Sequence, residues 1–256
     1  MFLFGEALGM TRSNNRPDHA LREWRFDTGY LPYAQGSVMT HSGRTQVLCA
    51  ATLEERQPGW MSDPKTGWVK AEYNMLPAST HQRSRRDTNR SNGRTHEIQR
   101  LIGRSLRGVT DLSKLGPRTL TLDCDVIVAD AGTRTASITG GWVALAIACG
   151  KLREEGKICE MPFTDQVAAV SLGIVGGRVL TDLDYEEDSA AETDLNLVMT
   201  SSGGLIEVQG TAEGAPFSRK ELDSILDAGW EALQELFKMQ RRALEQAGVN
   251  WQTVGV

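Results

Sequence analysis

One strand, one turn and one long helix follow each other directly in residues 118–155, and this segment constrains the fold most. The stretch RTLTLDCDVIVAD, residues 118–130, predicts a strand in which apolar and mostly polar side chains alternate. After a short turn, a helix is predicted from Arg134 to about Glu155. That helix is rich in small residues: Ala136, Gly140, Gly141, Ala144, Ala146 and Ala148. Small side chains permit close approach, so we expect the helix to pack tightly on a sheet.

The rest of the chain supplies more strands and two more helices. The other predicted elements are strands within residues 24–55, at 68–76 and between 165 and 212, a helix that begins between Asn92 and Arg94, and a closing helix in 217–246. Ser218 and Glu221 form a capping box at the start of the closing helix. This order predicts an α+β fold with helices packed on mixed sheets. No GxGxxG or GxxxxGK(S/T) motif is present, which disfavours a dinucleotide or P-loop enzyme.

Charge is unevenly distributed along this acidic chain, whose net charge is −5. A globally cationic nucleic-acid binder is therefore excluded. One block is rich in arginine: Arg83, Arg85, Arg86, Arg90, Arg94, Arg100, Arg104 and Arg107. Residues 182–194 carry seven carboxylates and no lysine or arginine. This separation of charge indicates two electrostatic sites rather than a uniform surface.

The turn that precedes the long helix has the properties of an anion site. A helix start exposes unpaired N–H groups and the positive end of the helix dipole. Gly132 permits close backbone approach, Thr133 offers an N–H and a hydroxyl, and Arg134 adds a planar guanidinium. Arg94 also stands at a predicted helix start, so both arginines could hold one phosphate ion. The alternatives are a plain capped helix with a solvated arginine, and an Arg94 that merely begins a basic helix.

Two carboxylates, Asp188 and Asp194, flank the predicted loop DSAAETD before a strand. They could hold Mg²⁺ together with water, or protonate a leaving oxygen. The alternative is a solvated acidic loop, which is what we expect for Asp182, Glu186 and Glu187. No Ser/His/Asp set or reactive Cys/His pair is present. A bound phosphate, a metal and an arginine-rich loop together favour phosphoryl transfer to phosphate on a polyanion.

Other features of the sequence indicate in which cellular compartment the protein acts. The longest apolar stretches are shorter than the roughly 20 residues of a membrane helix, so no membrane association is expected. The N-terminus lacks the basic segment of a signal peptide. The four cysteines and four histidines show no metal-ligand spacing, which is typical of free thiols in a reducing cytoplasm.

Several long motifs give the chain a specific family resemblance. They are TQVLCAATLEE, GWVKAEYNMLPAST, GRTHEIQRLIGRSLRG, DLSKLGPRTLTLDCDVIVADAGTRTASITG, DLDYEEDSAAETDLNLVMT and EVQGTAEGAPFSR. From about Leu21 to the final helix, the chain resembles the ribonuclease PH family of phosphorolytic 3′→5′ exoribonucleases. The resemblance implies the ribonuclease PH variant of the ribosomal protein S5 domain 2-like fold. It also implies a single domain in residues 10–256, while residues 1–9 are an extension and a candidate for disorder.

The resemblance further implies the reaction and the assembly. Such an enzyme trims the 3′ ends of tRNA precursors with inorganic phosphate and releases nucleoside diphosphates, and the reaction can run backwards as nucleotide addition. The implied assembly is a cytoplasmic homohexamer, a trimer of dimers, that uses Mg²⁺. A non-catalytic RNA-binding subunit of an exonuclease ring is the alternative. A small-molecule kinase of related fold would need a glycine- and serine-rich nucleotide loop, which is not evident.

The resemblance also implies roles for individual residues. Phosphate would be held by Arg94, Gly132, Thr133 and Arg134. Asp188 and Asp194 would serve Mg²⁺ binding and protonation of the leaving group. RNA would be contacted by Arg83, Arg85, Arg86 and Arg90. One departure lies in the phosphate turn, where Ala131 stands in place of the usual glycine. This departure matters if residue 131 needs a positive φ.

Overall fold

The computed structural model describes Arg12 and residues 15–85 and 93–250 of the chain. Its strands are β1 (Trp24–Thr28), β2 (Gly36–Ser42), β3 (Thr45–Glu54), β4 (Trp68–Met75), β5 (Thr119–Val128), β6 (Val167–Val175), β7 (Arg178–Thr181), β8 (Thr193–Thr200) and β9 (Leu205–Ala212). Its helices are α1 (Gly93–Arg107), a 3₁₀ turn (Leu112–Leu115), α2 (Thr133–Glu154), α3 (Tyr185–Ser189) and α4 (Arg219–Gln246). The predicted extension, residues 1–9, lies outside the described residues.

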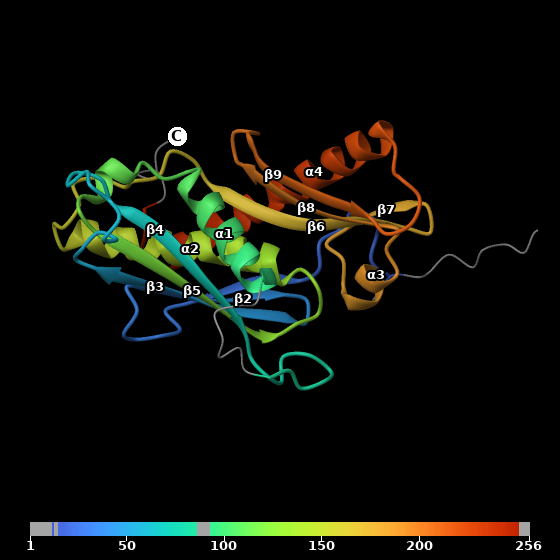
Figure 1. Cartoon of the computed structure of the whole chain (residues 1–256), viewed down its shortest axis with the longest axis horizontal. Coiled ribbons are helices and arrows are strands. Elements are labelled where there is room, and N and C mark those ends of the chain that lie inside the picture. The colour runs from blue at the N-terminus through green and yellow to red at the C-terminus, as the bar shows by residue number, and fades with distance from the viewer. Residues whose placement is uncertain (1–11, 13–14, 86–92, 251–256) are drawn as a thin grey trace, which may run out of the picture.

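Two sheets organise these elements (Figure 1). The first has the strand order β1-β2-β3-β5-β4, and only its β4–β5 pair is parallel. The second has the order β7-β6-β8-β9 and is antiparallel throughout. One mixed and one antiparallel sheet with helices packed on them confirm the predicted α+β fold.

Helix α2 lies at the centre and contacts strands of both sheets. Its small residues explain this position. A methyl group on Gly140 would lie 1.7 Å from Thr40 Oγ1 of β2, and one on Gly141 would lie 2.5 Å from Leu122 Cδ2 of β5. The helix is long and apolar enough to cross a membrane, but 89% of its apolar 18-residue stretch is buried inside the protein. It is therefore a core helix, and its predicted close packing on a sheet is confirmed.

The predicted helix starts agree with the structure, whereas one acidic segment differs. Helix α1 begins at Gly93, and Ser218 caps α4 by accepting a hydrogen bond from the backbone of Glu221. In the segment 165–212, for which strands were predicted, β7 ends at Thr181, because Asp182 has a φ of 56° and leaves the extended conformation. The segment then forms α3, a short helix that the sequence pattern did not predict.

Candidate active site

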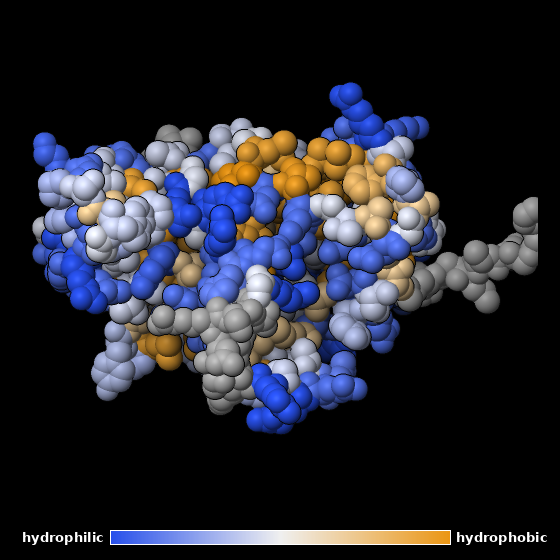
Figure 2. Space-filling model, in the orientation of Figure 1, coloured by the Kyte–Doolittle hydropathy of each residue, from blue (hydrophilic) through white to orange (hydrophobic). Residues whose placement is uncertain are grey.

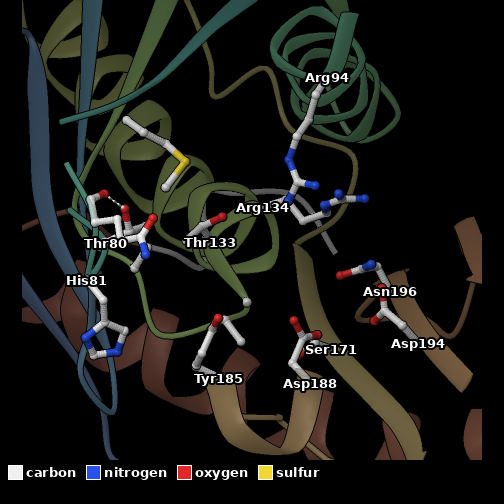
Figure 3. A pocket seen from close by; sticks show the side chains of 15 residues that line it. Thr80, His81, Arg94, Thr133, Arg134, Ser171, Tyr185, Asp188, Asp194 and Asn196 are labelled. Carbon is white, nitrogen blue, oxygen red and sulfur yellow. Dashed lines mark hydrogen bonds between the residues drawn. The ribbon is translucent and has the colours of Figure 1, made fainter. Parts of the chain in front are cut away.

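A cavity of about 500 Å³ lies between residues of the two sheets. Its lining comes from the chain after β4, the start of α1, the turn between β5 and α2, helix α3, and strands β6 and β8. Figure 3 shows Arg94 and Arg134 on one side, with Asp188 and Asp194 across from them. The six residues predicted to bind phosphate or metal therefore line one cavity.

The turn before α2 lines the cavity and has an unusual backbone conformation. Ala131 and Gly132 both have positive φ, 57° and 64°, and α2 starts at the next residue. Within the described part of the chain, no side chain caps this helix start, so its N–H groups can bind an anion. Ala131 therefore occupies a conformation that glycine would adopt more easily, as the departure at this position implied.

Neighbouring side chains hold this turn in place. Thr45 Oγ1 donates to the carbonyl of Ala131 at 2.7 Å, and Arg22 Nη1 donates to the carbonyl of Asp130 at 2.6 Å. The hydroxyl oxygens of Tyr73 and Thr133 lie 2.8 Å apart, within hydrogen-bonding distance. Burial raises the pKa of Tyr73, which keeps its hydroxyl protonated. Thr133 is thus oriented by a residue of β4.

The two arginines approach the cavity from separate helices, as predicted. Each is the second residue of its helix, Arg94 in α1 and Arg134 in α2. Arg134 Nη1 donates to Gln209 Oε1 at 2.6 Å, and Gln209 Nε2 donates to Glu97 Oε1 at 2.6 Å. Gln209 therefore links Arg134 to α1, the helix that carries Arg94.

The two aspartates lie on different elements of the cavity wall. Asp188 is in α3 and Asp194 is in β8. Burial raises the pKa of Asp188, although the charges of Arg134 and Arg94 oppose this shift. Burial also raises the pKa of Asp194, and the nearby charge of Asp188 raises it further. The pKa of Asp194 thus depends on the charge of Asp188, and the pKa values of both aspartates depend on the charges of the two arginines.

This donor pair fits Mg²⁺, which proteins often bind through one or two carboxylates while water fills the other positions. No group of three or more His, Cys, Asp or Glu side chains that could hold a metal occurs among the residues described. Any magnesium bound by this chain would therefore need ligands from water or substrate.

The expectation that Asp182 and Glu187 are solvated is wrong. Asp182 is fully buried and accepts hydrogen bonds from Arg22, Trp24 Nε1 and Ser42. Glu187 is also buried and pairs with Arg12 and Arg16. The signal that was overlooked is the set of arginines near the N-terminus, which neutralises these carboxylates. Glu186 is exposed, as expected.

The predicted RNA-binding arginines are only partly described. Arg83 and Arg85 are exposed and do not line the cavity, and Arg86 and Arg90 lie outside the described residues. Sequence reasoning missed other lining residues, among them Ser171, Asn196 and the ring pair of His81 and Tyr185, whose centroids are 5.8 Å apart. Tyr185 and Asn196 lie within a quoted family motif, but nothing in the sequence pattern assigned these residues to the site, because they converge only after folding.

Comparison with known proteins identifies the family. Residues 20–149 match domain 1, and residues 165–232 match domain 2, of the 3′ exoribonuclease family. The chain is 52% identical over 235 residues to ribonuclease PH of Synechococcus sp. (strain CC9605), covering 92% of this chain and 95% of that protein. It is 52% identical over 236 residues to ribonuclease PH of Parasynechococcus marenigrum (strain WH8102), with the same coverage.

Two solved structures share the fold at low sequence identity. Rice (Oryza sativa) Rrp46 has a TM-score of 0.76 and 19% identity, covering 91% of this chain and 100% of that one. An Archaeoglobus fulgidus exosome structure with RNA bound to the active site has a TM-score of 0.77 and 20% identity, covering 90% of this chain and 92% of that one. These likenesses show the fold, and the two family matches and the 52% identical relatives show that the chain belongs to the ribonuclease PH family of 3′ exoribonucleases.

Proposed function

We propose that this protein is a phosphorolytic 3′→5′ exoribonuclease that uses inorganic phosphate to release nucleoside diphosphates from RNA. One observation carries the proposal: Arg94 and Arg134, from two helix starts, line the same cavity as Asp188 and Asp194. The names of the 52% identical relatives support the same activity.

Orthophosphate binds at the start of α2. The free N–H groups of the helix start and the positive end of its dipole favour a dianion. Arg134 adds a planar fork that matches two phosphate oxygens, and Arg94 adds a second positive charge from α1. Phosphate bound there would face Asp188 and Asp194, whose side chains Figure 3 shows across the cavity from Arg94 and Arg134.

The reaction transfers the terminal nucleotidyl group from RNA to phosphate. A phosphate oxygen attacks the phosphorus of the last internucleotide linkage, and a new P–O bond forms. The bond from that phosphorus to the 3′ oxygen of the preceding nucleotide breaks, and the leaving oxygen takes up a proton. The products are a nucleoside diphosphate and an RNA shortened by one residue. Because their pKa values are raised, the Asp188 and Asp194 pair can hold the proton that the leaving oxygen needs.

Asp188 and Asp194 are also the residues that would hold Mg²⁺. The ion would supply positive charge against the phosphates of the substrate. In this arrangement the two carboxylates face the leaving oxygen from one side of the cavity. The arginines hold the attacking phosphate from the other side.

The RNA is held mainly by its phosphates. Arg83 and Arg85 are exposed on the chain segment that also supplies Thr80, His81 and Gln82 to the cavity. They add positive charge close to that segment; Arg86 and Arg90 follow them in the sequence and lie outside the described residues. Contacts of this kind tolerate different sequences, which suits tRNA precursors with varied 3′ extensions in the cytoplasm.

A homohexamer, a trimer of dimers, is the proposed assembly. Figure 2 shows apolar surface gathered over the region of β9 and α4. Leu205 and Val208 of β9 are 56% and 40% exposed, and Tyr33 and Trp60 are exposed elsewhere. Surfaces of this kind suit subunit contacts. Light scattering of the protein as it elutes from a size-exclusion column measures its mass and so checks the assembly. A monomer that is fully active would contradict the hexamer.

Product analysis tests the activity. The protein is incubated with 3′-extended tRNA and Mg²⁺, with and without phosphate. We expect nucleoside diphosphates that form only with phosphate. Arg94→Ala and Arg134→Ala should each lower this activity by about 10- to 150-fold, since a hydrogen bond to a charged group contributes about 1.5–3 kcal/mol.

Arg153→Ala is the matched control, because Arg153 is exposed at the other end of α2 and should leave the activity unchanged. Release of nucleoside monophosphates by water would contradict phosphorolysis. RNA binding without any product would favour the non-catalytic subunit.

A further inference from the structure

Ser171 carries a buried hydroxyl that the protein leaves without a partner. The residue is 2% exposed, and its Oγ atom has no hydrogen-bond partner among the described residues. An unsatisfied buried hydroxyl is unfavourable and is rare in folded proteins. Its presence in the wall of a cavity therefore points to a ligand.

The hydroxyl faces the phosphate turn. Ser171 lies on β6 and lines the cavity, and a methyl group built on Gly132 would be 3.5 Å from Ser171 Oγ. Figure 3 shows Ser171 and Asp188 on the side of the cavity away from Arg94. The hydroxyl is therefore next to the place where the start of α2 binds an anion.

Hydroxyl groups nearby on α2 all have partners, which makes Ser171 the exception on this face. Thr135 Oγ1 donates to the carbonyl of Gly132 at 2.9 Å, and Ser137 Oγ donates to the carbonyl of Thr133 at 2.8 Å. Thr139 Oγ1 donates to the carbonyl of Ala169, on the same strand as Ser171, at 3.1 Å. Among the residues that the structure describes, two other buried hydroxyls lack partners, those of Ser79 and Thr181, and neither lines the cavity.

Strand pairing places Ser171 in a row of neutral polar residues. It is directly opposite Asn196 of β8, and Asn196 is opposite Gln209 of β9. Gln209 at the far end of the row already bonds Arg134. The second sheet thus presents uncharged hydrogen-bonding groups beneath the arginine, and Ser171 is the member nearest to Gly132.

We propose that Ser171 is a phosphate-binding residue whose hydroxyl donates a hydrogen bond to an oxygen of the orthophosphate held at the start of α2. This inference rests on the proposed function, because it deepens the same anion site. The arginines supply charge from α1 and α2, and Ser171 supplies a neutral donor from β6. A neutral donor binds the oxyanion next to Asp188 without forming a competing ion pair with that carboxylate.

Ser171→Ala tests the proposal, since it removes only the hydroxyl. The Michaelis constant for phosphate should rise about tenfold or more, since a hydrogen bond to a charged group contributes at least about 1.5 kcal/mol. The Michaelis constant for RNA should not change. Ser171→Cys, which keeps a weaker donor at the same place, should give an intermediate constant for phosphate.

Thermal unfolding with and without inorganic phosphate, in the absence of RNA, gives a readout that does not depend on catalysis. A ligand that binds the folded protein raises the melting temperature, and the rise is larger when the ligand binds more tightly. Ser171→Ala should melt at or above the wild-type temperature without phosphate, and phosphate should raise its melting temperature less. Ser105→Ala is the matched control: Ser105 is buried in α1 and bonded to the carbonyl of Leu101, so its loss should lower stability and leave the response to phosphate intact.

The outcomes separate this inference from the proposed function. A wild-type enzyme that needs no phosphate defeats the function. A phosphate-dependent wild type whose Ser171→Ala variant has the same phosphate constant and the same thermal response defeats only the role of Ser171. A raised constant for RNA with an unchanged constant for phosphate would assign the hydroxyl to the nucleic acid and also overturn the proposal.

Discussion

Two clusters of arginine and carboxylate meet at α3, and they differ in whether their carboxylates are paired with arginine. The closed cluster consists of Arg12, Arg16, Arg22, Asp182 and Glu187. The open cluster consists of Arg94, Arg134, Asp188 and Asp194. In the closed cluster each carboxylate is bonded to arginine and shielded from solvent. In the open cluster, neither aspartate forms an ion pair within the part of the chain that the structure describes.

The pKa values of the aspartates reflect this difference. Burial acts to raise the pKa of Asp182, but the charge of Arg22 and hydrogen bonds from Arg22 and Trp24 outweigh it, so the pKa is lowered. For Asp188 and Asp194 the effect of burial prevails, and their pKa values are raised. Paired carboxylates such as Asp182 stabilise the fold, whereas Asp188 and Asp194, which form no ion pair among the described residues, keep their capacity to bind a ligand.

Arg22 connects the two clusters. Its guanidinium bonds Asp182 on one side and the carbonyl of Asp130 on the other, and a methyl group on Gly132 would lie 2.8 Å from its Nη2. The closed cluster thus supports the turn that binds the anion in the open one.

The largest effect is expected from Asp182→Asn, which tests the closed cluster. Asparagine tolerates the positive φ of residue 182, so the substitution removes the charge and leaves the backbone preference. Breaking a buried pair by removing one charge costs about 3–5 kcal/mol of unfolding free energy. Urea unfolding measures it. Asp27→Asn, in an exposed pair with Arg25, is the control, with an expected loss below about 1 kcal/mol. Equal losses would remove the distinction between a buried and an exposed pair.

The same substitution at Asp194 should have the opposite sign. Between the ordinary value of 3.8 and its raised pKa, the folded carboxyl keeps a proton that the unfolded chain releases, so stability falls as pH rises through this window. Asp194→Asn removes that cost and should raise stability at neutral pH by about 0.5–2 kcal/mol. Activity should fall by roughly 10²- to 10⁴-fold. Unfolding curves at several pH values check the sign, and a destabilised variant would place Asp194 among the structural charges.

A smaller effect is expected from Ala131→Gly, at the turn that joins the clusters. A non-glycine residue with positive φ costs about 1–2 kcal/mol, and the added flexibility of glycine in the unfolded chain offsets part of the gain. We expect a net gain below about 1 kcal/mol and a similar phosphate constant. Ala146→Gly, inside α2, should instead cost about 1 kcal/mol or more. Comparison of the two melting temperatures tests whether the turn is strained.

The smallest effect concerns the exposed arginines that extend the open cluster. If Arg83 and Arg85 contact RNA phosphates, their replacement by alanine should reduce the salt dependence of RNA binding. The slope of log K against log salt should fall by about 0.7 for each arginine, as expected for single strands. Titrations at several salt concentrations measure this slope, with Arg153→Ala as control. An unchanged slope would confine RNA contacts to other residues.

Much of the fold could be predicted because its signals are local. The alternation in residues 119–128, the small residues of α2 and the capping box of Ser218 each depend on neighbours in the sequence, and each predicted element is present. The arginines at the two helix starts could be found in the same way. Helix α3 could not, since five residues carry too little periodicity to reveal a helix.

The sequence by itself determined most of the elements that form, which charged residues stand at the helix starts, and, through its motifs, the family of the chain. Only the tertiary structure decided which charges are neutralised and which remain for a ligand. Asp182 and Asp188 are six positions apart in one acidic segment, yet one is bonded to Arg22 and the other faces the cavity. The physical reason is that burial and pairing depend on residues far away in the sequence, such as Arg22, 160 positions from Asp182, and their positions exist only in the folded chain.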